Sequence, residues 1–540
     1  MPGMQSDQPA TAGIGPRLRA VLRSPLLYLL LFVGIANSLT MPRFFYLGDS
    51  FAVRAETAYL LTEGELGIPY AERQRLAAFV AHRGQYFFEN DRSRRFASKY
   101  GFGNTLFYIP PMLAEKWYRG SLDLLHQSES LLLFLNIQNV LLTLIVALYL
   151  YKSVSFYTSR SSLRVGFVLA CLYCSFVWHY LRAPTLEVFL LFGVSGFTFH
   201  MLAFLRSVDD PVPGTRRPWI HLSLATTYAG LMVLMKLFSV LFLVAAWLFA
   251  LCSRPASLSF SRRLKHNLTR DLRPQLAHLL LPSVIAVALV LSLNQHRFGS
   301  ALEAGYSQWV TDVGDADWAE PGFRPGRFSP AFLGHAMPEF LFQRGNTNIF
   351  LHQPLLLLAL VGVPAFWRKH RLDCAFLAFV FSTNLVALFF FASWRGEWCY
   401  GPRYLVPVLM VGVLPAVEVA GWLRGSARSA VGIVGLSLLG LILAVSLRLQ
   451  VCVNSLPFFA YNQIRPAFQA FRDARVVQYW DAPVHRGCIY CDLLAHRNGE
   501  RILYPLVVLE EILPERSRER LGRVSQVVEE HSKSNYFFFR

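Results

Sequence analysis

Two acidic residues, Asp49 and Glu56, follow the first long apolar run of this sequence and are its clearest candidates for chemistry. A carboxylate at the edge of a bilayer is costly, so an acid found there is expected to have a function. A carboxylate within about 3 Å of a hydroxyl can accept its proton and activate the oxygen as a nucleophile. The alternatives are that Asp49 caps the helix that follows it and that Glu56 lies on a solvated helix face.

Three basic residues near the ends of apolar segments could hold an anion. Lys99 precedes a short apolar run, Arg403 lies in an aromatic loop, and Lys236 interrupts a long apolar stretch. An unpaired ammonium group inside a membrane is expensive, so Lys236 needs a partner, and Glu187 is the acid predicted at the same membrane edge. The alternatives are that Lys99 is an interfacial lysine whose head reaches water and that Arg403 belongs to an interfacial aromatic belt.

The composition indicates that a membrane protein positions these groups. Of the 540 residues, 54% are hydrophobic and 16% are charged, and the mean hydropathy is +0.37, as in integral membrane proteins with many spans. The net charge of +18 does not indicate nucleic acid binding. The basic residues cluster in short loops, where they set the topology and face anionic lipid.

Apolar runs of roughly 20 residues predict an all-α polytopic fold with about 11 transmembrane helices. The stretch 220–252 is too long for one span, and Lys236 in its middle predicts two shorter helices. The other runs lie near 22–41, 129–152, 163–181, 184–205, 276–294, 349–367, 374–393, 404–422 and 428–448.

The charge bias predicts how these helices are oriented, because short loops rich in Lys and Arg stay in the cytoplasm. Such loops are 152–164, 216–217, 254–273 and 368–371, and all fall on one side together with the N-terminal segment 1–21, which lacks a cleavable signal. The other side receives 42–128, 295–348, 394–403 and the tail 449–540, which is expected to form a small α/β or irregular extracytoplasmic domain. The expected location is the plasma (inner) membrane.

The first outer segment, 42–128, is patterned rather than a plain linker. Residues 55–64 predict a short helix that ends at Gly64. The segment 98–113 is too short to span, and Pro110 and Pro111 are expected to break a continuous helix. We expect it to dip into the outer leaflet.

Six short motifs occur in order along the chain. They are GDS at 48–50, AETAYLL at 55–61, SKYGFG at 98–103, APTLEVFLLFG at 183–193, RFGSALEAGY at 297–306 and RGEWCYGPRYLVP at 395–407. This series resembles the C-type (GT-C) multi-spanning glycosyltransferases, and more closely bacterial members similar to protein O-mannosyltransferases and the lipid A aminoarabinose transferase. The resemblance covers 22–422 and identifies 22–448 as a GT-C-like transmembrane domain.

The resemblance implies an enzyme that moves a sugar from a polyprenyl phosphate to an extracytoplasmic lipid, glycan or protein. In such enzymes an acid of the first outer loop, here Asp49, is the general base for the acceptor hydroxyl, and Glu56 is the second candidate catalytic residue. The leaving phosphate requires cations. The implied substrate- and phosphate-binding residues are Lys99, Tyr100, Arg403, Lys236 and Glu187.

The implied partners are the sugar donor, its acceptor and membrane lipid, without nucleic acid. Ser50 stands where many relatives have a second acid, so no metal ligand is assigned and a divalent-metal cofactor is left open. In the tail, the CIYC pair favours a local disulfide or unpaired thiols over a zinc site, although the nearby residues include metal-ligand types at His485, Cys488, Cys491 and His496.

Two other functions are compatible with the sequence. A transporter or flippase of lipid-linked saccharides would line its pathway with Glu187 and Lys236. The absence of an internal repeat in the sequence and the large outer loops argue against it. The second alternative is a non-catalytic protein of envelope assembly.

We predict that the tail and 42–128 are extracytoplasmic, whereas Arg262 and Arg263 are cytoplasmic. In a cysteine-free background, an impermeant thiol reagent should label Cys488 in cells whose inner membrane is intact. It should label an Arg262→Cys variant only after the inner membrane is permeabilised. The reverse order of labelling would overturn the topology.

Overall fold

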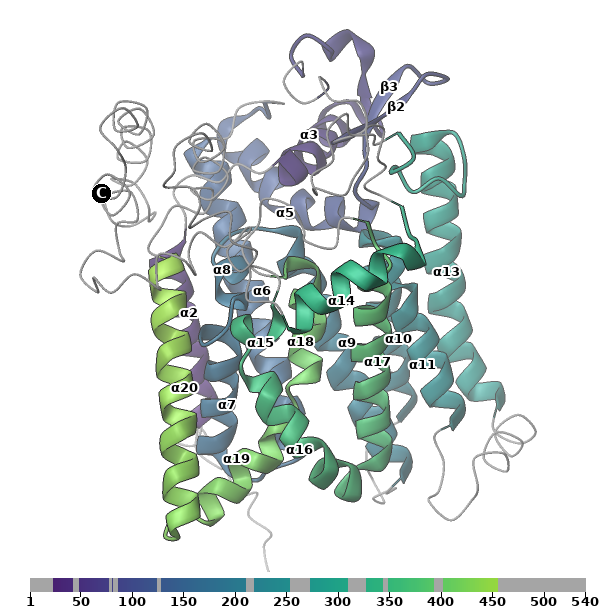
Figure 1. Ribbon diagram of the computed structural model, residues 1–540. Coiled ribbons are helices and arrows are strands. Elements are labelled where there is room, and N and C mark those ends of the chain that lie inside the picture. The colour runs from purple at the N-terminus through teal and green to yellow at the C-terminus, as the bar shows by residue number, and fades with distance from the viewer. Residues whose placement is uncertain are drawn as a thin grey trace, which may run out of the picture.

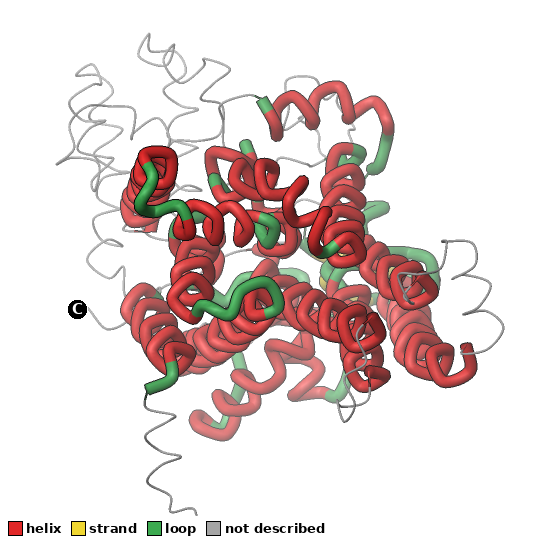
Figure 2. The backbone as a smooth tube through the Cα atoms, turned by 90° about the horizontal axis from the view of Figure 1, so that it is seen from below, coloured by secondary structure: helices red, strands yellow, loops and turns green. Residues whose placement is uncertain are grey.

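In the computed structural model of this chain, most elements are helices that run side by side along one axis (Figure 1), and many are seen end-on along that axis (Figure 2). The structure describes residues 23–41, 48–76, 80, 86–123, 128–209, 218–252, 272–308, 327–342, 348–392 and 402–454. The segment 1–21, residues Arg262 and Arg263, and most of the tail, with its CIYC pair, lie outside these ranges.

The described helices include at least one in every predicted apolar run. They are α2 (Pro25–Thr40), α3 (Gly48–Glu63), α5 (Phe102–Arg119), α6 (Glu129–Ser155), α7 (Ser161–Tyr173), α8 (Val177–Leu181), α9 (Leu186–Asp209), α10 (Pro218–Met235), α11 (Val240–Cys252), α13 (Leu272–Phe298), α14 (Leu333–Leu341), α15 (Ile349–His352), α16 (Leu355–Lys369), α17 (Arg371–Phe389), α18 (Val406–Gly412), α19 (Ala416–Gly425) and α20 (Ala430–Asn454). Short 3-10 helices are η1 (Tyr70–Glu72), η2 (Leu237–Ser239), η4 (Pro330–Phe332) and η5 (Arg403–Leu405).

Among the described residues, 6 helices are long and apolar enough to cross a membrane, or 7 if the pair Arg403–Gly412 and Ala416–Gly425, bent by 49°, is one span. This confirms the helical, multi-span fold. The predicted number of spans is not reached by this criterion, because several apolar runs are shorter or interrupted helices. The run 163–181 divides into α7 and α8, and 349–367 divides into α15 and α16.

The long apolar stretch 220–252 is two helices, as predicted. α10 ends at Met235, Lys236 has extended backbone with φ −153° and ψ 113°, and η2 leads into α11. The break puts the ammonium group of Lys236 at the end of α10 rather than in the middle of a span.

The first outer segment contains a small sheet that the sequence analysis did not predict. Its strands are β1 (Ile68–Pro69), β2 (Phe87–Asn90) and β3 (Arg95–Ser98), antiparallel in the order β1-β3-β2. The sheet, α3 and α5 lie together at one end of the helix bundle (Figure 1). α3 ends next to Gly64, whose φ is +73°, which confirms the predicted helix end, although the helix begins earlier, at Gly48.

The expected break at Pro110 and Pro111 is wrong, because α5 continues through both residues. Proline at position 111 cannot donate to the carbonyl of Phe107 one turn earlier. The Nε2 of Gln138 on α6 donates to that carbonyl at 2.7 Å instead. A neighbouring helix therefore supplies the hydrogen bond that the proline removes.

The opposite end of the bundle gathers several predicted cytoplasmic loops. Arg206 at the end of α9 donates to Asp373 of α17 at 3.0 and 2.9 Å and to the carbonyl of Phe156 at 2.8 Å. The Tyr157 hydroxyl donates to Asp373 at 3.2 Å. The ends of 152–164 and 368–371 thus meet at the end of the bundle remote from α3 and α5 (Figure 1), as expected for loops on one side of a membrane.

Two glycines of the SKYGFG motif bring α5 against the end of α10. A Cβ atom on Gly101 would lie 2.2 Å from the carbonyl oxygen of Leu234, and one on Gly103 would lie 2.6 Å from the backbone nitrogen of Met235. Asn104 donates to the Met235 carbonyl at 3.1 Å. This backbone approach brings Lys99 and Lys236 to one region.

We predict that Gly101→Ala destabilises the protein by about 1–3 kcal/mol, because the added methyl group meets backbone that cannot rotate away. The melting temperature of detergent-purified protein measures this. Gly166→Ala is the matched control, since nothing lies within 4 Å of its added Cβ. Equal melting temperatures for Gly101→Ala and the wild type would contradict the close approach.

Candidate active site

The carboxylate of Asp49 is held by two side chains from distant parts of the chain. The Tyr100 hydroxyl donates to Oδ1, and Nη1 of Arg403 lies 3.5 Å from Oδ2. Asp49 is the second residue of α3, so its position in the first turn also suits the positive end of the helix dipole. Its side chain is 23% exposed. The carboxylate is therefore oriented and still open to a reactant.

Tyr100 is a donor to this carboxylate over the whole ordinary pH range. Burial, and secondly the negative charge of Asp49, raise the pKa of Tyr100 well above its usual value. The hydroxyl consequently stays protonated. A phenol that donates to one carboxylate oxygen leaves the other oxygen to different partners.

Arg403 bridges two acids. Its Nη1 is 4.0 Å from Oε1 of Glu187, in the first turn of α9, besides its contact with Asp49. Glu187, the predicted partner of Lys236, lies within ion-pair distance of Arg403 and close enough to Lys236 for their charges to interact. The Nζ of Lys236 lies 4.1 Å from the ring centroid of Tyr404. An arginine fork can reach two acids at once, which a lysine point charge does less well.

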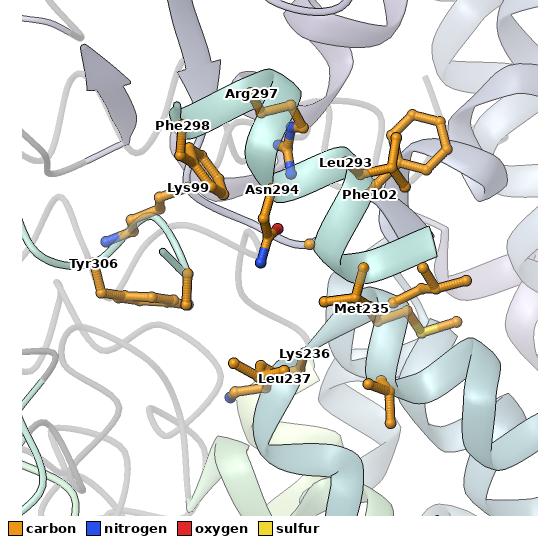
Figure 3. A pocket seen from close by; sticks show the side chains of 15 residues that line it. Lys99, Phe102, Met235, Lys236, Leu237, Leu293, Asn294, Arg297, Phe298 and Tyr306 are labelled. Carbon is orange, nitrogen blue, oxygen red and sulfur yellow. The ribbon is translucent and has the colours of Figure 1, made fainter. Parts of the chain in front are cut away.

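A pocket of about 50 Å³ opens beside this group, between the start of α5 and the ends of α10 and α13 (Figure 3). Its polar lining is Lys99, Lys236, Asn294, Arg297 and Tyr306. Its apolar lining includes Phe102, Val233, Leu234, Leu237, Val290, Leu293 and Phe298. Basic groups and an apolar wall in one pocket suit an amphiphile with an anionic head.

Lys99 is a buried residue of this pocket. Its residue exposure is 3%, so the alternative of an interfacial lysine that reaches water is wrong. Its Nζ lies 5.4 Å from the ring centroids of both Tyr100 and Tyr306. Aromatic faces stabilise a cation by electrostatic attraction, and they keep this ammonium group near the pocket.

Glu56 does not lie on a solvated helix face. Its side chain is 0% exposed, and both of its oxygens accept hydrogen bonds from Arg297, at 2.9 and 2.8 Å. Arg297 and Tyr306 are not among the predicted site residues, although they begin and end the motif RFGSALEAGY. The feature of the sequence that could have identified Arg297 is its position at the end of a long apolar run.

Residues 393–401 of the aromatic loop before Arg403 lie outside the described ranges. Within those ranges, no group of three or more His, Cys, Asp or Glu side chains is arranged to hold a metal ion.

No protein-family model matches the chain, and no curated protein matches it by sequence. Two similar solved structures are ArnT from Cupriavidus metallidurans bound to undecaprenyl phosphate, and the archaeal oligosaccharyltransferase AglB from Archaeoglobus fulgidus in complex with an inhibitory peptide and a dolichol-phosphate. For ArnT the identity is 13% and the TM-score 0.43, over 97% of this chain and 78% of that one. For AglB the identity is 12% and the TM-score 0.48, over 89% of this chain and 60% of that one.

At these identities and TM-scores, the likeness assigns no role to any residue of this chain.

Proposed function

We propose that the chain is a membrane glycosyltransferase that moves a sugar from a polyprenyl phosphate to a hydroxyl of a lipid, glycan or protein outside the plasma membrane. The observation that carries the proposal is the arrangement of two consecutive residues. Lys99 lines the pocket, and Tyr100 binds the carboxylate of Asp49. A group that can hold a phosphate and a group that can take a proton are thereby fixed next to each other.

Asp49 is the proposed general base. Its carboxylate accepts the proton of the acceptor hydroxyl as the oxygen attacks the anomeric carbon from the face opposite the phosphate. The new glycosidic bond forms as the bond between the anomeric carbon and the phosphate oxygen breaks. Tyr100 and Arg403 orient the carboxylate, and Glu187, the second acid on Arg403, is proposed to face the sugar.

Lys99 and Lys236 are the proposed phosphate ligands. The phosphate gains negative charge as the sugar leaves, and fixed cations in a partly dry pocket stabilise that charge. The apolar lining from α10 and α13 would take the first part of the polyprenyl chain. Arg403 was also a candidate phosphate ligand, but its contacts with Asp49 and Glu187 favour a role in orienting the base.

We predict that Asp49→Asn lowers transfer by more than about 100-fold, because it removes the proton-accepting charge and little else. Tyr100→Phe should lower it about tenfold or more, the scale of a hydrogen bond to a charged group. Transfer is measured with purified protein in detergent, and melting temperatures report folding. Wild-type turnover by Asp49→Asn would refute the assigned base.

We predict that Lys99→Ala and Lys236→Ala each weaken use of the donor by about 1.5–3 kcal/mol in kcat/KM. Arg403→Lys should retain more activity than Arg403→Ala, yet less than the wild type, since lysine cannot form the fork. Lys369→Ala is the control, because Lys369 pairs with Glu418 at the other end of the bundle.

The same assay separates an enzyme from a transporter, since translocation does not contribute in detergent. A wild-type protein that transfers no sugar from any polyprenyl phosphate donor would contradict the proposal and favour transport. Full transfer by both lysine variants would reject the assigned phosphate site but not the proposed transferase activity.

A further inference from the structure

A fully buried ion pair, Glu56 with Arg297, lies at the edge of the pocket that Arg297 helps to line, and it has no assigned step in the chemistry described above. Nε of Arg297 donates to Oε1 of Glu56 at 2.9 Å, and Nη2 donates to Oε2 at 2.8 Å. The side chains are 1% and 0% exposed. Both oxygens of Glu56 are occupied, so this carboxylate is poorly placed to act as a second base.

The same guanidinium group also binds the backbone that carries Lys99 and Tyr100. Nη2 of Arg297 donates to the carbonyl oxygen of Ser98 at 2.5 Å and to that of Tyr100 at 2.9 Å. These two carbonyls flank Lys99. One arginine thus fixes the peptide segment from which Lys99 reaches the pocket and Tyr100 reaches Asp49.

The acid of the pair is joined to the base by a single helix. Glu56 follows Asp49 by seven residues on α3, which is about two turns and places both side chains on the same helix face. Arg297 belongs to the last turn of α13, whose Leu293 and Asn294 line the pocket. The pair therefore connects the base helix, the Lys99–Tyr100 segment and one wall of the pocket.

The surroundings of the pair leave this segment little room to shift. Asn90 of β2 donates to the carbonyl of Arg297 at 3.1 Å. In the loop after α13, a Cβ on Gly305 would lie 2.9 Å from Cα of Lys99, and the φ of Gly305 is +81°. Sheet, loop and helix thus hold the Lys99 backbone from several directions.

We propose that Glu56 and Arg297 are positioning residues that set the distance between the base Asp49 and the phosphate ligand Lys99. This inference rests on the proposed function. The acceptor hydroxyl attacks the anomeric carbon from the face opposite the leaving phosphate. The base and the phosphate site must therefore lie on opposite sides of that carbon atom. A misplacement of about 1 Å can cost about 100-fold in rate, so a rigid link between them has a direct kinetic consequence.

Exchanging the charges of Glu56 and Arg297 distinguishes a positioning role from a purely electrostatic one. In the double variant Glu56→Arg/Arg297→Glu the opposite charges remain together, but a carboxylate then faces the carbonyls of Ser98 and Tyr100 and offers them no donor. If the pair matters only for its charges, the exchange restores activity. If it positions the Lys99–Tyr100 segment, the exchange does not.

The kinetic test compares Arg297→Lys, Glu56→Gln and the exchange variant with the wild type, at matched amounts of folded protein. We expect Arg297→Lys to raise KM for the donor and lower kcat, for a combined loss of about 10- to 100-fold in kcat/KM. Arg73→Lys is the control, since the Arg73–Glu89 pair is near the same end with Arg73 52% exposed.

Binding of radiolabelled polyprenyl phosphate, without any sugar, supplies a second measurement. Glu56→Gln is nearly isosteric and does not line the pocket, yet we expect it to bind the lipid phosphate more weakly than the wild type does. Wild-type lipid binding, KM and kcat in Glu56→Gln and Arg297→Lys would overturn the inference, and so would full activity of the exchange variant. If the wild type binds the lipid but transfers no sugar, the proposed function is refuted. The binding of the lipid by the Glu56 and Arg297 variants would still show whether the pair positions Lys99.

Discussion

The site depends on how the segment from Ser98 to Gly103 is held. Arg297 binds its carbonyl oxygens on one side, and on the other side its glycines allow it to touch the backbone of α10. Because the backbone is fixed from both sides, the neighbouring side chains Lys99 and Tyr100 can serve different partners. A segment free to rotate would not keep an ammonium group in the pocket and a phenol on Asp49 at the same time.

The charged groups at this end of the bundle are held by specific partners. Asp49 and Glu187 share Arg403, and Glu56 is bound by Arg297. The two lysines of the pocket lie over aromatic rings, which stabilise a cation without neutralising it. Burying charged groups is costly unless they are paired or hydrogen-bonded, which accounts for the arginine partners of these acids.

The sequence predicted local features well and long-range partners poorly. The apolar runs, the break at Lys236 and the helix end at Gly64 depend on composition within a few turns. The structure has the break and the helix end, and it has helices in all the runs, although several of these are interrupted. The strands of the small sheet have 2 to 4 residues, too few to show a period. The path of α5 through its prolines depends on Gln138 of another helix. The partner of Glu56 lies 241 residues away, and no pattern along one sequence reveals such a pair.

The most direct test of the central claim is photocrosslinking with a polyprenyl phosphate that carries a photoreactive group next to the phosphate, followed by peptide mapping. The account predicts crosslinks in 99–102, 233–237 and 290–306, the segments that line the pocket, and their loss when unlabelled polyprenyl phosphate competes. Crosslinks at the opposite end of the bundle, around Arg206 and Asp373, or crosslinks that no unlabelled lipid displaces, would contradict it.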